Sequence, residues 1–201
     1  MRNMVELMSR VGKKPISIPE GVEIKTEGCR VFIKGPKGEI AKDFQPEISI
    51  EAKEGKIFVL SDKKILNEKK IPGREAKRIK SLWGMTRMML ENMVKGVVSE
   101  FEKKLEIEGV GLKAEVAGQE ISLSVGYSKP VKIEIPQNLK VSVQKNVITI
   151  SGIEKDLVGQ FASILRKVKP AEPYKGKGLK YEGELIRRKV GKKVVTAGGG
   201  K

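Results

Sequence analysis

The stretch Ile18-Pro19-Glu20-Gly21-Val22-Glu23-Ile24 returns in altered form 117 positions later, as Ile135-Pro136-Gln137-Asn138-Leu139-Lys140-Val141. In both places an Ile-Pro pair leads into an alternating strand pattern, a polar turn and a second strand, which ends at Gly35 or Gly152. Alternation of apolar and polar residues is typical of half-buried β-strands. We interpret the stretches as two copies of one unit. Chance similarity of two hairpins is the alternative, and the shared Ile-Pro start and closing glycine argue against it.

A helical pattern follows the first copy. Residues 74–98 carry apolar side chains at helical spacing, namely Ile79, Leu82, Trp83, Leu90, Met93, Val94 and Val97. We expect Trp83 to pack in the core. We expect Met85, Met88 and Met89 to widen the apolar stripe toward the sheet.

A second helical pattern spans residues 154–168. Its stripe consists of Leu157, Val158, Phe161, Ile164, Leu165 and Val168. Acidic residues open this segment and basic residues close it, which suits the helix dipole, and Pro170 ends it.

These patterns predict an α+β fold. It consists of two similar domains from an internal duplication, each a small, mainly antiparallel sheet packed on one amphipathic helix, followed by a basic C-terminal tail. The first copy is expected to insert an extra hairpin before its helix. We place an N-terminal extension at residues 1–9, with Met8 as an alternative start. The first domain then takes 10–99, the second 100–171 and the tail 172–201.

Charge is concentrated at the C-terminal side of the chain. The 201 residues carry a net charge of +16, and residues 166–201 hold 12 Lys/Arg against 3 Glu. A skewed basic excess is typical of a protein with a polyanionic partner. A membrane surface would also attract it, but the sequence has no run of 18 apolar residues. Nucleic acid is therefore the favoured partner, and no membrane contact is expected.

The segment 172–181 suits such a partner best. It reads Glu172-Pro173-Tyr174-Lys175-Gly176-Lys177-Gly178-Leu179-Lys180-Tyr181. Lysines supply cations, glycines permit close backbone approach, and tyrosines supply stacking faces. A solvated, flexible basic tail is the plain alternative. Near the N-terminus, Arg10, Lys13 and Lys14 form a short basic arm that either touches RNA or is merely solvated.

The composition argues against an enzyme. The chain has no histidine and one cysteine, so a disulfide within the chain and a multi-cysteine zinc site are excluded. Glu106 and Glu108 share a strand face, but a solvent-facing edge explains them. Cys29 is expected to be a packed core thiol. We expect no catalytic residue, no metal, no cofactor and no small-molecule substrate.

Three stretches resemble a known family. Residues 9–16 read Ser9-Arg10-Val11-Gly12-Lys13-Lys14-Pro15-Ile16, residues 105–111 read Leu105-Glu106-Ile107-Glu108-Gly109-Val110-Gly111, and residues 172–178 are followed by Tyr181. Together they resemble the family of the bacterial-type large-subunit ribosomal protein numbered six. The resemblance spans about residues 8 to 193 and is most specific in the last stretch.

The resemblance implies the same duplicated α+β fold. It also implies a structural component of the large ribosomal subunit, cytoplasmic and within the ribosome, that binds 23S-type rRNA near the stalk base and the factor-binding region. Neighbouring large-subunit proteins would be further partners. A free-standing RNA-binding module is the alternative, although the strands carry few aromatic residues for stacking.

The expected RNA contacts combine cations, backbone and aromatic faces. We expect the tail to be disordered in the free protein and to become ordered on RNA. The candidate residues are Tyr174, Lys175, Gly176, Lys177, Gly178, Lys180, Tyr181, Arg187, Arg188, Lys189, Arg166, Lys169, Arg10, Lys13 and Lys14.

Overall fold

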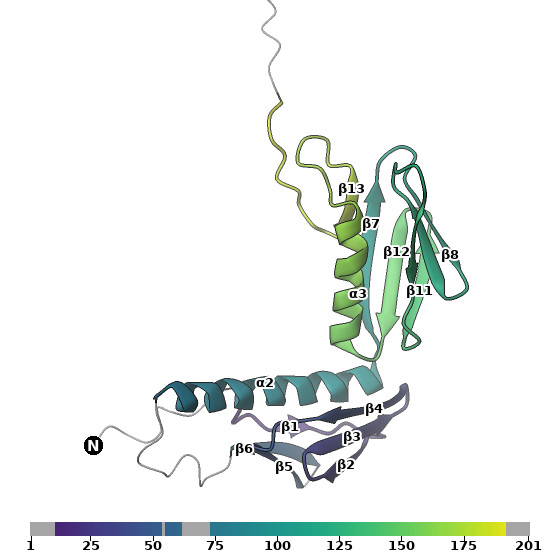
Figure 1. Ribbon diagram of the computed structural model, residues 1–201. Coiled ribbons are helices and arrows are strands. Elements are labelled where there is room, and N and C mark those ends of the chain that lie inside the picture. Colours follow the sequence, from purple (N-terminus) through teal and green to yellow (C-terminus); the bar gives the residue numbers. More distant parts are fainter. Residues whose placement is uncertain (1–10, 54, 62–72, 192–201) are drawn as a thin grey trace, which may run out of the picture. The chain divides into compact units, whose positions relative to one another are not determined.

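The computed structural model describes residues 11–53, 55–61 and 73–191 (Figure 1). The expected N-terminal extension, Met8, Arg10 and residues 192–201 lie outside the described residues. The chain divides into two compact units. Unit 1 runs to Phe101 and includes residues 153–155, and unit 2 comprises the rest from Glu102 onward. Each unit is described by itself.

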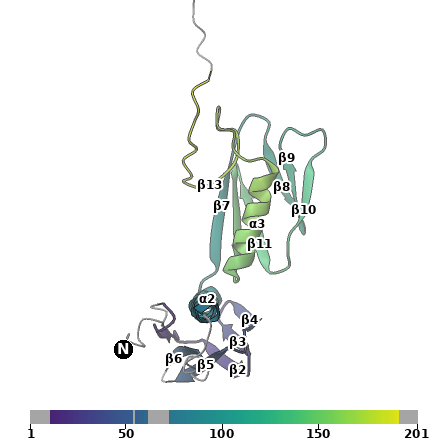
Figure 2. The same cartoon turned by 60° about the vertical axis from the view of Figure 1, so that its left-hand side comes forward.

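The described residues of unit 1 form two antiparallel three-stranded sheets and one long helix. The strand orders are β2-β3-β4 and β1-β6-β5. Figure 2, which looks along α2, shows the strands on one side of the helix. The elements are β1 (Ile16–Ser17), β2 (Glu23–Glu27), β3 (Arg30–Gly35), β4 (Gly38–Asp43), β5 (Ile48–Lys53), β6 (Lys56–Ser61) and α2 (Gly73–Val98).

The core of unit 1 forms where α2 meets both sheets. Trp83 is 5% exposed and its indole Nε1 donates a hydrogen bond to the Val59 carbonyl at 2.7 Å, which confirms its packing role. Strand residues such as Val31, Ile33 and Ile57 are also buried in this core. Apolar burial of this kind is the main force that holds a helix on a sheet.

Two sequence expectations for unit 1 were wrong. Met85 and Met88 are 49% and 41% exposed, because they lie off the line of Ile79, Trp83 and Leu90 that faces the sheets. Met89 does pack against the core, as expected. Cys29 is exposed rather than packed in the core. It occupies a two-residue turn between β2 and β3, where its side chain has no sheet face to join.

Unit 2 repeats this plan with one addition. Its strand orders are β10-β9-β8 and β11-β12-β7-β13. Helix α3 lies along one face of β7 and β12 (Figure 1). The elements are β7 (Phe101–Glu108), β8 (Lys113–Ala117), β9 (Glu120–Ser124), β10 (Val131–Glu134), β11 (Leu139–Gln144), β12 (Val147–Gly152), α3 (Lys155–Val168) and β13 (Gly178–Tyr181).

The duplicated α+β architecture is confirmed, but its expected register was wrong. The three strands β1-β6-β5 of unit 1 have the same order as β7-β12-β11 of unit 2. The hairpin equivalent to β11–β12 is therefore β5–β6, about 90 positions earlier, and not β2–β3. Among the described residues, the first copy has no hairpin that the second lacks, so the expected extra hairpin was wrong. Two short antiparallel hairpins with the same alternation are alike in sequence, so an Ile-Pro match alone cannot choose between them.

Strand β13 distinguishes the two units. It pairs antiparallel with β7, from Gly178 opposite Glu108 to Tyr181 opposite Leu105. Residues 172–201 were assigned to a tail, yet four of them form a strand of the unit 2 sheet. None of the described helices is long and apolar enough to span a membrane.

Candidate nucleic-acid interface

Strand β13 fixes the basic segment to the body of unit 2. Leu179 is fully buried, and its backbone N–H donates to the Lys169 carbonyl at 2.8 Å, just past α3. A parallel bridge links Leu179 with Pro170. Because an apolar side chain and ladder hydrogen bonds both hold it, this part of the segment is ordered without RNA.

The two glycines of the segment serve internal packing. The Gly176 N–H donates to the Glu172 carbonyl at 2.8 Å, closing the loop before β13. At Gly178 a Cβ would lie 2.7 Å from the Pro170 carbonyl oxygen, and φ is +140°. Both glycines are buried. The sequence suggested that they expose backbone to RNA, whereas here they let the loop pass close to the end of α3.

Lys180 is neutralised by two carboxylates of β7. Its Nζ lies 3.0 Å from Glu108 Oε2 and 3.3 Å from Glu106 Oε2. The hydrogen bonds to Glu108 and Glu106 raise the pKa of Lys180, and the bond from Lys180 lowers the pKa of Glu108. Arg188 adds a longer contact of 3.8 Å to Glu108. The paired glutamates noticed in the sequence thus attach β13 to the sheet.

Tyr181 is likewise engaged within the protein. The guanidinium carbon of Arg166 lies 5.2 Å from the ring centroid and Lys103 Nζ lies 5.7 Å from it. Arg166 also pairs with Glu184, whose other carboxylate oxygen accepts a hydrogen bond from the Tyr181 N–H at 3.0 Å. Arg166 and Tyr181 therefore lock the turn after β13 onto α3, which limits their availability to a nucleotide.

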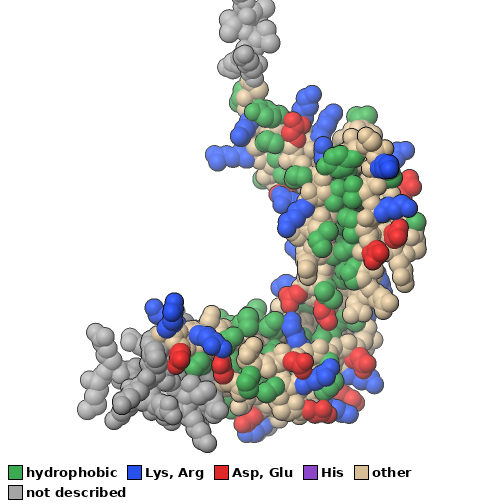
Figure 3. Space-filling view, in the orientation of Figure 1, with side chains coloured by type: hydrophobic (Ala, Val, Ile, Leu, Met, Phe, Trp, Pro, Cys, Tyr) green, Lys and Arg blue, Asp and Glu red, His purple; other side chains and the backbone are tan. Residues whose placement is uncertain are grey.

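The remaining candidates in this segment form an exposed group. Tyr174 is 53% exposed. The Lys189 N–H donates to the Pro173 carbonyl at 2.9 Å, which brings the later residues back beside the loop. Figure 3 shows several Lys and Arg side chains around this part of unit 2. We call this group the basic loop surface; it consists of Tyr174, Lys175, Lys177, Arg187 and Lys189, all of them exposed.

The basic arm near the N-terminus belongs to unit 1. Lys13 and Lys14 are exposed there, and the Lys14 carbonyl accepts a hydrogen bond from Arg87 Nε at 3.3 Å. Arg10 lies outside the described residues.

An aromatic residue that the sequence reasoning passed over lies at the end of α3. The Tyr127 hydroxyl donates to the Val168 carbonyl at 3.0 Å, and Lys169 Nζ lies 5.6 Å from the ring centroid. The ring is nevertheless exposed, with 55% of the residue accessible. A tyrosine in a short Gly-Tyr-Ser-Lys-Pro loop is the signal that would have found it.

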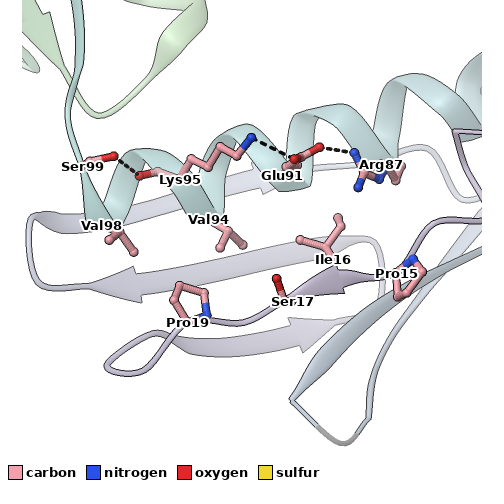
Figure 4. Close-up of a pocket in the computed structure, with 10 residues that line it drawn as sticks. All are labelled: Pro15, Ile16, Ser17, Pro19, Arg87, Glu91, Val94, Lys95, Val98 and Ser99. Atoms are coloured by element: carbon pink, nitrogen blue, oxygen red, sulfur yellow. Dashed lines mark hydrogen bonds and ion pairs between the residues drawn. The ribbon is translucent and has the colours of Figure 1, made fainter.

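A separate groove of about 260 Å³ lies between β1 and α2 in unit 1 (Figure 4). Its charged wall consists of Glu91 between Arg87 and Lys95, which are one helical turn away on either side. The hydrogen bond from Lys95, together with the charges of both bases, lowers the pKa of Glu91. Because these charges satisfy one another, they stabilise the helix and suggest no catalytic arrangement.

Comparison with known proteins identifies the family. The model of the family described as ribosomal protein L6 matches residues 18–100 and again 108–182. The chain belongs to the ribosomal protein L6 family. The two consecutive matches of the L6 model correspond to units 1 and 2 and are offset by the same 90 positions as the strands.

Individual L6 relatives match the sequence of this chain over nearly its full length. A protein of Dictyoglomus thermophilum named large ribosomal subunit protein uL6 is 50% identical over 92% of this chain and 98% of its own. Relatives of the same name in Carboxydothermus hydrogenoformans and Moorella thermoacetica are 45% and 47% identical over 96% of this chain and all of theirs. The resemblance seen in the sequence is thus confirmed.

Membership of the L6 family also decides the enzyme question. L6 proteins are structural components of the ribosome, so the expectation of a non-enzyme is confirmed. Within the described part of the chain, no group of three or more potential metal-ligating side chains comes together.

Proposed function

We propose that this protein is a structural component of the large ribosomal subunit that binds 23S-type rRNA in the cytoplasm and stabilises its fold near the stalk base. The observation that carries the proposal is the basic loop surface, held in place by β13 on a folded body. The names of the uL6 relatives support the ribosomal setting. The stalk-base location rests on the family resemblance alone.

The binding residues divide into two roles under this proposal. Lys175, Lys177, Arg187 and Lys189 neutralise phosphates, and Tyr174 stacks on a base or contacts a 2′-hydroxyl. The engaged residues hold that surface in its conformation: these are Arg166, Gly176, Gly178, Lys180, Tyr181 and Arg188. Lys169 adds a further cation in unit 2, and the basic arm of Arg10, Lys13 and Lys14 is a separate candidate RNA contact in unit 1. Neighbouring ribosomal proteins are further partners.

A preordered surface has an energetic consequence. A tail that folds only on RNA binds more weakly, because its ordering on binding costs entropy. A segment already paired with β7 is ordered before binding, so most of that entropic cost does not reduce its affinity. The geometry therefore favours recognition by shape and phosphate position over readout of base sequence.

The salt dependence of rRNA binding tests the proposal. We compare the wild-type chain with a variant carrying Lys175→Gln, Lys177→Gln, Arg187→Gln and Lys189→Gln. The matched control removes four exposed unit 1 cations, by Lys25→Gln, Lys34→Gln, Lys37→Gln and Lys56→Gln. Losing four phosphate contacts should reduce the slope of the logarithm of the rRNA association constant against the logarithm of salt concentration by about 3. The slope of the control should stay close to that of wild type.

Two results would reject the proposal. One is an unchanged slope and affinity in the loop-surface variant. The other is sedimentation of the native protein apart from large subunits after a moderate salt wash, which would favour a free-standing RNA-binding module.

A further inference from the structure

Residues 126–130, which belong to the loop between β9 and β10, lie at the same end of unit 2 as the basic loop surface. The Tyr127 hydroxyl bonds to Val168, the last residue of α3. Two residues of the basic segment also contact the chain directly after α3. The Leu179 N–H donates a hydrogen bond to the Lys169 carbonyl, and Gly178 packs against Pro170. Figure 2, which labels β9 and β10, shows the loop between them at the end of unit 2 where α3 ends. The 126–130 loop and the basic segment, about 45 residues apart in the chain, thus form one continuous surface at the C-terminal end of α3.

The electrostatics of this edge suit an anion despite the helix. The C-terminal end of a helix carries a partial negative charge of roughly half an electron, which alone would repel phosphate. Here the Val168 and Lys169 carbonyls are covered by the Tyr127 O–H and the Leu179 N–H. The exposed or half-buried cations of these segments are Lys129, Lys167, Lys169, Lys175 and Lys177. The acids are Glu172 and Glu108, of which Glu108 lies opposite Gly178 and is paired with Lys180.

Tyr127 has the chemistry of a nucleotide contact. Its hydroxyl is fixed by one donated hydrogen bond and keeps lone pairs that accept from a ribose 2′-hydroxyl. Lys169 stands over the ring, and the residue is still 55% exposed. An exposed, rigidly held aromatic ring beside cations is the arrangement on which unpaired bases stack.

We propose that the loop 126–130 is a second RNA-binding element, in which Tyr127 stacks on an unpaired rRNA base and Lys129 contacts the adjoining phosphate. This proposal rests on the proposed function and extends it to a residue outside the C-terminal segment. The RNA surface then runs from Tyr174 across the end of α3 to Tyr127. Its ligand is a folded large-subunit rRNA with at least one base turned out of its helix.

Equilibrium binding to a full-length 23S-type rRNA transcript, with small-subunit rRNA as competitor, tests this proposal. The variants of the full chain are Tyr127→Leu, Tyr127→Phe and Lys129→Gln. Lys140→Gln, at the start of β11 toward the other end of α3, is the matched charge control. Circular dichroism and thermal unfolding of each variant verify that unit 2 remains folded.

Stacking predicts a specific pattern of affinities. Tyr127→Leu should weaken binding roughly 5- to 150-fold, the usual range for one base–aromatic stack. Tyr127→Phe keeps the ring and should stay within about threefold of wild type. Lys129→Gln should lower the salt slope by about 0.7–0.9, and Lys140→Gln should leave it unchanged.

Other patterns overturn the inference. Equal losses for Tyr127→Phe and Tyr127→Leu would mean that the hydroxyl merely holds the loop. Wild-type affinity for Tyr127→Leu would remove the residue from the RNA surface, while leaving the proposed function intact. A photoreactive phenylalanine analogue at position 127 that crosslinks to protein rather than RNA in native large subunits would assign the loop to a protein neighbour. Failure of the wild-type chain to prefer 23S-type rRNA would instead reject the proposed function itself.

Discussion

Lys180 on β13 places its ammonium nitrogen 3.0 Å from the carboxylate of Glu108 on β7. The two residues are not directly opposite in the ladder, since Glu108 pairs with Gly178 and Lys180 with Glu106. Lys180 therefore bridges two acids on one sheet face and ties the last strand to its neighbour diagonally as well as directly.

This bridge predicts a change in the titration of Glu108. Replacing Lys180 by Gln should raise the pKa of Glu108 toward its ordinary value of 4.5, because Lys180 is the main cause of the lowered value. Arg188→Gln should raise it much less, since Arg188 contributes least. Carboxyl NMR titration of the three proteins measures both effects. Equal shifts in the two variants would contradict the assignment.

The same pair makes the attachment of β13 pH-dependent. The pKa of Glu108 is lower in the folded chain. Its contribution to the free energy of unfolding is therefore complete above pH 4.5 and disappears as the pH falls through its pKa in the folded protein. The pKa of Lys180 is raised, so its contribution is complete below pH 10.5 and is lost as the pH rises through the folded value. The stability difference between wild type and Lys180→Gln should vanish at both extremes. Denaturant unfolding across pH tests this, and a difference that persists in strong acid would exclude the ion pair as its source.

Leu179 should be the main apolar anchor of the C-terminal segment. Leu179→Ala removes a fully buried side chain, so we expect the free energy of unfolding of unit 2 to fall by about 2–5 kcal/mol. Leu185→Ala is the matched control, because Leu185 is 97% exposed and should change stability by less than about 0.5 kcal/mol. Urea unfolding followed through unit 2 amide signals measures both. Similar values for the two variants would show that β13 is not packed as described.

Gly178 tests the close approach of the loop to α3. Gly178→Ala places a methyl group 2.7 Å from the Pro170 carbonyl oxygen at a φ of +140°, so clash and backbone strain add. Gly183→Ala has a positive φ of +75° but nothing within 4 Å, so it carries the strain alone, about 1–2 kcal/mol. The Gly178 variant should therefore unfold at a clearly lower denaturant concentration. Equal midpoints would mean that the packing against Pro170 is dispensable.

We expect Arg166 to act mainly by stabilising the folded protein rather than by contacting RNA directly. Arg166→Gln removes the stack on Tyr181 and the partly exposed pair with Glu184, a loss of about 1 kcal/mol. Lys167→Gln removes the same charge from an exposed neighbouring position and should change stability by less than about 0.5 kcal/mol. Thermal unfolding ranks the two. If both variants are equally stable yet Arg166→Gln binds rRNA more weakly, Arg166 is a direct contact instead.

Much of the architecture follows from local patterns that act over a few residues. The helical spacing from Ile79 to Val97 predicts α2 almost to its ends, and Pro170 marks the end of α3, because helix formation depends on near neighbours. The equivalence of hairpins between the two units could not be obtained in this way. Strand order depends on pairing between segments far apart, and several hairpins carry the same alternation.

The binding segment shows the same limit. Composition alone finds the lysines, glycines and tyrosines of residues 174–181, but it cannot distinguish an exposed cation from one neutralised by a distant acid. Lys175 is exposed, whereas Lys180 meets Glu106 and Glu108, which lie about 70 residues earlier. The Gly-Tyr-Ser-Lys-Pro loop draws attention to Tyr127 in the sequence, but its position beside the basic segment depends on Val168, which is 41 residues away.

The position of β13 near the C-terminal end of the described chain determines when unit 2 can complete its folding during synthesis. A growing polypeptide folds from its N-terminal side, and β13 is made after every other element of this unit. Until residues 178–181 have been synthesised, the outer edge of β7 is unpaired and exposes the apolar site that Leu179 fills. A nascent chain stopped before Gly178 would therefore keep apolar surface exposed and would lack the strand that holds the proposed RNA-binding loop in place.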